Sequence, residues 1–98
     1  MDYNSIINSN NVVLVEFFAT WCPHCKRMIP VMEEVKKLLG NRVPVYTIDI
    51  DENEKEAEDN KIETIPTFIV YHNGIQVWRH SGEIDKQDLI GHVESLLQ

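Results

Sequence analysis

The 98 residues, 43% hydrophobic and 26% charged, have the composition of a globular protein, which excludes a disordered tail or a fibre and suits a single domain over residues 1–98. The net charge of −7 argues against a nucleic-acid-binding protein, because neutralising phosphates requires clustered Lys and Arg. No stretch approaches the roughly 18 apolar residues that span a bilayer, so we expect no membrane contact.

The first 11 residues lack the basic start and the apolar run of a secretory signal, which favours a cytoplasmic protein. An exported form that had been cleaved and given a new Met would begin in the same way, so this alternative stays open. We expect these residues to form an irregular or short helical segment that leads into the first strand.

The next two elements are a buried strand and an amphipathic helix. Residues 12–18 are almost continuously apolar, as in a strand covered on both faces, and Glu16 is the one discordant residue. Pro30 falls inside the helix and is expected to kink it. Gly40 and Asn41 are expected to end it. Apolar residues at steps of four, three and four predict one buried stripe: Met28, Met32, Val35 and Leu39.

A second strand and an acidic segment follow. Residues 43–50 predict a strand whose side chains alternate between two sides, with Tyr46, Ile48 and Ile50 on one and Val43, Val45 and Thr47 on the other. The helix before them predicts a parallel pairing with the first strand. Residues 49–63 carry eight of the sixteen acidic residues and predict a short solvated helix with flanking loops.

The last third of the chain predicts a hairpin and a helix. Asn73-Gly74 separates two β-rich runs, residues 67–72 and 75–80, and is a strong signal for a two-residue antiparallel hairpin. Asp85 can cap a final helix. The order is therefore βαβαββα, in an α/β fold. The apolar face of the final helix is expected to contain Leu89, Ile90, Val93, Leu96 and Leu97.

The segment Trp21-Cys22-Pro23-His24-Cys25 follows the buried strand and opens the helix. A cysteine at a helix N-terminus faces unpaired N–H groups and the positive end of the helix dipole, which favour thiolate over thiol. Cys22 is therefore the exposed candidate nucleophile, and Cys25, one turn further in, is the shielded resolving thiol. Two cysteines are too few for a disulfide framework, so their spacing points to redox or metal chemistry.

Further motifs occur in a fixed order around this segment, and together they resemble the thioredoxin superfamily from residue 12 to residue 97. The strand and loop before Cys22 are similar to those that lead into a thioredoxin active site. The other matching segments are Cys25-Lys26 followed by Pro30 (its kinked helix), Ile65-Pro66-Thr67 (its cis-proline loop), Asn73-Gly74 (its hairpin turn) and Ser81-Gly82 (its glycine loop).

The resemblance implies the thioredoxin fold, with a four-stranded mixed sheet flanked by helices and without the family's usual first strand. It implies a monomeric thiol-disulfide oxidoreductase in which Cys22 attacks a protein disulfide, a mixed disulfide forms and Cys25 resolves it. The electron donor would be a thioredoxin-reductase-like protein or another thiol. The Cys22–Cys25 disulfide would be the redox centre, with no metal or organic cofactor. Substrate contacts would come from Trp21, Pro23, Ile65, Pro66 and Gly82.

Two departures from the thioredoxin pattern bear on the mechanism. The pair Pro23-His24 is similar to that of DsbA-type oxidases, so we expect His24 to stabilise the Cys22 thiolate and to make the couple more oxidising. Glu16 matches the family's buried Asp and its expected role is proton transfer, while Thr47 occupies the place of the family's lysine partner. Without that cation, burial should raise the pKa of Glu16.

Other interpretations stay open. The protein could be a disulfide-donating oxidase of the DsbA type, or a non-enzymatic domain that uses its cysteines for interaction or to bind metal. Two cysteines fall short of the four ligands of structural zinc unless two chains share the site. Glu16 could be a strand-edge carboxylate and His24 a spectator. Trp78, on the hairpin, is expected to be a packing residue. The remaining histidines form no recognisable group: His72, His80 and His92.

Overall fold

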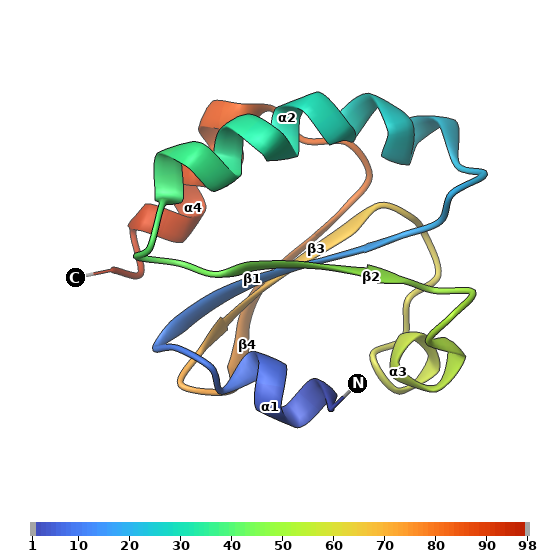
Figure 1. Cartoon of the computed structure of the whole chain (residues 1–98), viewed down its shortest axis with the longest axis horizontal. Helices are drawn as coiled ribbons and strands as arrows, with labels where there is room; N and C mark the ends of the chain where they lie inside the picture. The colour runs from blue at the N-terminus through green and yellow to red at the C-terminus, as the bar shows by residue number, and fades with distance from the viewer. Residues whose placement is uncertain (1, 98) are drawn as a thin grey trace.

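The computed structural model describes residues 2–97. Its elements, in chain order, are α1 (Tyr3–Ile7), β1 (Val12–Phe18), α2 (Pro23–Leu39), β2 (Val45–Asp49), α3 (Glu54–Asp59), β3 (Thr67–His72), β4 (Ile75–Ser81) and α4 (Lys86–Glu94). They form three layers, with α2 and α4 on one face of the sheet and α1 and α3 on the other (Figure 1). From β1 onward this is the predicted order βαβαββα.

The strands form one four-stranded mixed sheet in the order β2-β1-β3-β4. β1 runs parallel to β2 and antiparallel to β3, and β3 and β4 form an antiparallel pair. β1 therefore lies inside the sheet, with a helix layer on each face (Figure 1). This position explains its continuous apolar sequence, because neither face of the strand meets water.

The two faces of the sheet carry separate hydrophobic clusters, because successive side chains of a strand point to opposite faces. The predicted stripe of α2 is buried in the cluster shared with α4, which confirms that prediction. The strand residues of this cluster are Val12, Leu14, Phe68 and Val70. The strand residues buried on the opposite face, under α1 and α3, are Val13, Val15, Phe17, Ile48, Ile69 and Tyr71.

α2 begins and ends where the sequence predicts. Pro23 occupies the first turn, where backbone N–H groups have no partner within the helix, so its missing N–H costs no hydrogen bond. The Cys22 sulfur caps the helix by accepting a hydrogen bond from the Cys25 N–H at 3.2 Å. At the other end Gly40 adopts φ 58° and donates its N–H to Lys36 O at 2.9 Å.

β2 and α4 are shorter than the sequence predicts. β2 begins at Val45 because Pro44 has no N–H to donate to the ladder, although its carbonyl still accepts from Leu14 N at 3.0 Å. α4 ends at Glu94, and the two leucines that follow still pack on the α2 side of the core: Leu96 and Leu97.

The turn between β3 and β4 has positive φ at both of its central residues, 53° at Asn73 and 79° at Gly74. This is the two-residue geometry that matches the twist of a hairpin, as the Asn-Gly pair predicts. Gly74 also lies close to Asn8, the residue that caps the end of α1, because a Cβ at this position would collide with the Asn8 side chain.

Gly74→Ala is expected to lower the free energy of unfolding by about 1–2 kcal/mol, because alanine there combines positive φ with a steric overlap. Gly91→Ala is the matched control, since Gly91 lies inside α4 with open space around it, and helix propensity predicts a gain of up to about 1 kcal/mol. Urea denaturation of both variants measures the difference. Equal stabilities would contradict this account of the turn.

Candidate active site

Cys22 and Cys25 are both free thiols at the start of α2, and each exposes only 3% of its surface. The prediction that Cys22 is exposed is therefore wrong. The loop before β3 covers it: Ile65 packs against the buried cluster of Ala19 and the two cysteines, and the Ile65 carbonyl oxygen lies 3.9 Å from the Cys22 sulfur.

The two loops expected to form a substrate groove meet beside Cys22. The Ile65–Pro66 peptide bond is cis, and Pro66 is buried. Gly82 donates its N–H to the Pro66 carbonyl oxygen at 2.7 Å and has φ 96°, a conformation that favours glycine. The structure thus brings together Ile65, Pro66 and Gly82 on one side of Cys22.

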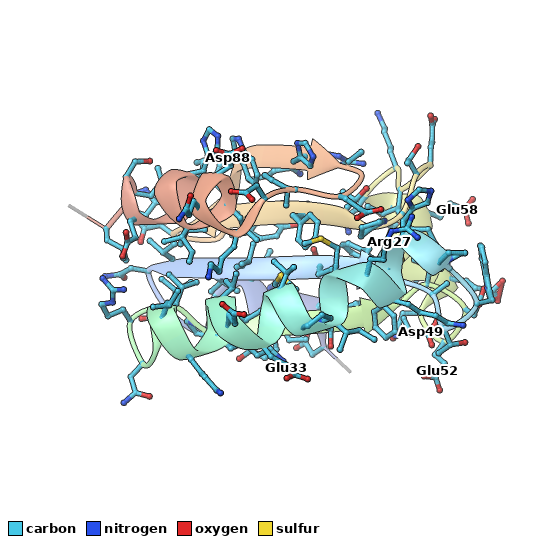
Figure 2. All side chains as sticks on the ribbon, turned by 90° about the horizontal axis from the view of Figure 1, so that it is seen from above. Arg27, Glu33, Asp49, Glu52, Glu58 and Asp88 are labelled. Atoms are coloured by element: carbon cyan, nitrogen blue, oxygen red, sulfur yellow. The ribbon has the colours of Figure 1, made fainter. Side chains whose placement is uncertain are left out.

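Trp21 directly precedes Cys22 in the chain and is 62% exposed, the exposure expected of a contact residue rather than of core filler. Its indole N–H donates to the Asp51 carboxylate at 2.7 Å, which ties the ring to the acidic segment after β2. Pro23 is also exposed. Figure 2 shows Asp49, Glu52 and Glu58 at the same end of the molecule as the start of α2, so the site lies beside an acidic surface.

His24 lies in a cluster of three charged or titratable side chains. Its Nδ1 lies 2.8 Å from the Glu83 carboxylate and 2.8 Å from Arg27 Nη2, and Arg27 Nε donates to the same Glu83 oxygen at 2.9 Å. These contacts hold the pKa of Glu83 below its usual range, and the hydrogen bond from His24 has the largest effect. One Nδ1 cannot both donate to Glu83 and accept from Arg27, so its protonation selects between the two hydrogen bonds.

Glu16 lies inside the sheet and is 5% exposed, which excludes the strand-edge interpretation. Its partner in the register with β2 is Thr47, an uncharged residue. Burial raises the pKa of Glu16 from 4.5 to about 7, and the positive charge of Lys36 acts in the opposite direction. The carboxyl group can therefore accept or release a proton near neutral pH, as the expected role requires.

Burial also raises the pKa of the Cys25 thiol, and its hydrogen bond with Cys22 and the charge of Glu16 add to that effect. A hydrogen bond involving the backbone of Ala19 acts in the opposite direction. A thiol in this environment is a poor nucleophile until a base removes its proton. These properties fit a resolving cysteine that reacts after, and not before, a base is in place.

A pocket of about 430 Å³ lies behind Cys25, between α2 and the strands β1 and β2. Glu16 and Cys25 both line it, so the carboxyl group and the Cys25 thiol share one open space. Apolar side chains from β1, the loop after it and α2 form much of the rest of the wall: Phe18, Ala19, Ile29 and Met32. Glu16 therefore borders an open space and is not enclosed by the core on every side.

Trp78 packs partly buried against the core, as predicted, and its ring stacks on two histidines. The ring centroids lie 4.6 Å from His92 and 6.0 Å from His80. His80 Nε2 also lies 3.1 Å from the Glu83 carbonyl oxygen. His80, on β4, and His92, on α4, therefore both stack against the Trp78 ring.

No helix within residues 2–97 has the length and apolar character needed to cross a bilayer. The same part of the chain contains no group of three or more His, Cys, Asp or Glu side chains arranged to hold a metal ion.

Three functional candidates are missing from the sequence-based set: Arg27, Lys36 and Glu83. The spacing of His24 and Arg27 on one helix face is a weak local signal. Glu83 lies 59 residues from His24 along the chain, and Lys36 acts on Glu16 through its charge, from the other side of a shared pocket. Contacts of this kind follow from tertiary packing, which residue spacing does not encode.

Comparisons with known proteins agree with this site. The family model described as "Thioredoxin" matches residues 1–95. Thioredoxin Y of Oryza sativa subsp. japonica is 39% identical over 92% of this chain, which spans 54% of that relative. The bifunctional thioredoxin reductase/thioredoxin of Mycobacterium leprae is 36% identical over 90% of this chain and 19% of its own length. A mutant thioredoxin from Halobacterium salinarum superposes with a TM-score of 0.89, at 30% identity, over 98% of this chain and 83% of that one. The chain therefore belongs to the thioredoxin family.

Proposed function

We propose that the protein reduces or exchanges disulfides of other proteins through the Cys22–Cys25 pair. The observation that carries this proposal is the site itself: two adjacent free thiols at a helix N-terminus, flanked by a cis-proline loop and backed by a buried carboxyl group. The redox-active disulfide serves as the only redox centre of the proposed reaction.

In the proposed reaction the Cys22 thiolate attacks one sulfur of a substrate disulfide. A mixed disulfide forms and the other substrate sulfur leaves as a thiolate. Glu16 then takes the proton from the Cys25 thiol, and the Cys25 sulfur attacks Cys22. The Cys22–Cys25 disulfide forms, the second substrate sulfur leaves, and two electrons have passed from the protein to the substrate.

The oxidised protein must be reduced again by a partner. The Mycobacterium leprae relative is named as a bifunctional thioredoxin reductase/thioredoxin, which supports a reductase of that class as electron donor. The acidic surface beside the site favours partners whose contact surface is neutral or basic, because like charges repel across an interface (Figure 2).

The proposed function is tested by the reduction of a protein disulfide, such as those of insulin, with dithiothreitol as electron donor. The protein should accelerate the reaction over dithiothreitol alone at catalytic amounts. Metal analysis of the same sample tests the non-enzymatic alternative. No acceleration, together with stoichiometric zinc or iron in the purified protein, would show that the cysteines form a shared metal site.

Replacing Pro23-His24 by Gly-Pro is expected to lower the reduction potential of the cysteine pair by about 30–60 mV, part of the roughly 150 mV that separates DsbA from thioredoxin. A histidine at the helix start that is protonated or donates an N–H stabilises the neighbouring thiolate, and so the reduced form. The shift is expected to be partial because His24 directs its Nδ1 to Glu83 and Arg27 and not to the sulfur.

Equilibration with glutathione buffers measures this potential. His92→Gln is the matched control, because it removes an exposed histidine that lies on α4. If the double variant and the wild type have the same potential, His24 is a spectator.

A further inference from the structure

The strand that pairs with Glu16 offers it no positive charge. In the parallel register of β1 and β2, Glu16 stands opposite Thr47, which has a hydroxyl group. The next strand along the sheet pairs Glu16 with Phe68, which is apolar. A buried carboxylate without a neighbouring cation is costly, so any compensating charge must come from outside the sheet.

α2 supplies the charged groups that face Glu16. The pocket that Glu16 lines is bordered on this helix by Cys25, Lys26, Glu33 and Lys36, and on β2 by Thr47. Glu33 lies on the side of α2 away from α4, and Arg27 lies on the opposite side of the helix (Figure 2). Lys36 follows Glu33 by three residues and therefore belongs to the same side of the helix.

Of these charges, Lys36 is the one that acts on Glu16. It is the only group in residues 2–97 whose charge opposes the effect of burial on the pKa of that carboxyl. Lys36 is itself exposed, so its ammonium group stays hydrated while its field reaches into the pocket. Neither Lys26 nor Glu33, which line the same pocket, has this effect.

We propose that Lys36 is a positioning residue for proton transfer: from α2 it supplies the positive charge that β2 lacks, and so sets the pH at which Glu16 can take the proton of Cys25. This inference rests on the proposed thiol-disulfide exchange. The cation acts through Glu16 and does not touch the reacting sulfurs. Removing the charge of Lys36 should therefore shift the pH profile of the resolving step and leave the rate of the first attack by Cys22 unchanged.

The first test is the titration of the Glu16 carboxyl carbon, followed by NMR in the reduced protein. Lys36→Met should raise the midpoint by about one pKa unit, because the lost charge favoured the carboxylate. Lys37→Met is the matched control, since Lys37 is exposed on the same helix but does not line the pocket. Lys36→Arg keeps the positive charge and should therefore have the same midpoint as the wild type. Equal midpoints in Lys36→Met and Lys37→Met would overturn the proposal.

The second test is the pH profile of the resolving step, measured as release of substrate from a preformed mixed disulfide. In Lys36→Met the profile should move to higher pH by the same amount as the NMR midpoint. At pH 7 the step should slow about fivefold, since a carboxyl with a pKa of about 7 would fall from half to about a tenth ionised. Adding Thr47→Lys to Lys36→Met should reverse the shift, because it places a cation opposite Glu16.

The two measurements separate this inference from the proposed function. The NMR titration needs no redox activity, so a midpoint shift in Lys36→Met supports the charge coupling even if the wild type fails to reduce disulfides. A midpoint shift without a shift of the pH profile in an active protein would overturn the role of Lys36 in proton transfer.

Discussion

Cys22→Ser is expected to abolish disulfide reduction, with a loss of at least about 1,000-fold, whereas Cys25→Ser should still attack and then accumulate mixed disulfides. The reason is the geometry at the start of α2. Cys22 caps the helix and lies beside the cis-proline loop, while the pKa of Cys25 is raised by burial. Mass spectrometry of each variant after incubation with a peptide disulfide measures the adduct.

Both serine variants place a slightly smaller polar group in a small buried cluster, so their thermal unfolding serves as the control for folding. The adduct should be found on Cys22 in the Cys25→Ser variant. If adducts instead form through Cys25 in the Cys22→Ser variant alone, the roles of the two cysteines are reversed.

Glu16→Gln is expected to remove a pH dependence of stability worth about 3 kcal/mol. The pKa of Glu16 rises from 4.5 in the unfolded chain to about 7 in the fold, because burial disfavours the charged form. Between these values the folded protein binds the proton more tightly than the unfolded chain. Stability is therefore highest below pH 4.5 and falls as the pH rises to 7, by about 1.4 kcal/mol for each unit of difference in pKa.

Urea denaturation at a series of pH values from 4.5 to 8 measures this effect as the difference between the wild type and Glu16→Gln. Glu54→Gln is the control for the loss of one negative charge, because Glu54 is exposed in the first turn of α3. Parallel curves for the wild type and Glu16→Gln would show that the carboxyl group is not desolvated in solution.

The sequence predicts those parts of the fold that depend on local chemistry. Asn73-Gly74 specifies a turn with two positive φ values, and it forms one. Pro23 and Gly40 mark the two ends of α2 because one lacks an N–H and the other tolerates φ 58°. The continuous apolar run of β1 predicts a strand with both faces covered, and the structure places that strand inside the sheet.

The parts that the sequence does not predict depend on contacts between distant segments. The position of Cys22 at a helix end suggests exposure, but the loop at Ile65, 43 residues further on, covers it. The missing lysine on β2 predicts an unpaired Glu16, yet Lys36 partly compensates for it from α2. In both cases the decisive neighbour is fixed by the packing of a loop or helix against the sheet.

The most direct test of the central claim is the reduction potential of the Cys22–Cys25 pair, measured by equilibrating the protein with glutathione buffers and separating the dithiol from the disulfide by mass. The account predicts a reversible two-electron transition with a midpoint above about −270 mV, the value of thioredoxin, and below about −120 mV, the value of DsbA. A protein that forms no Cys22–Cys25 disulfide at any ratio of oxidised to reduced glutathione would contradict it.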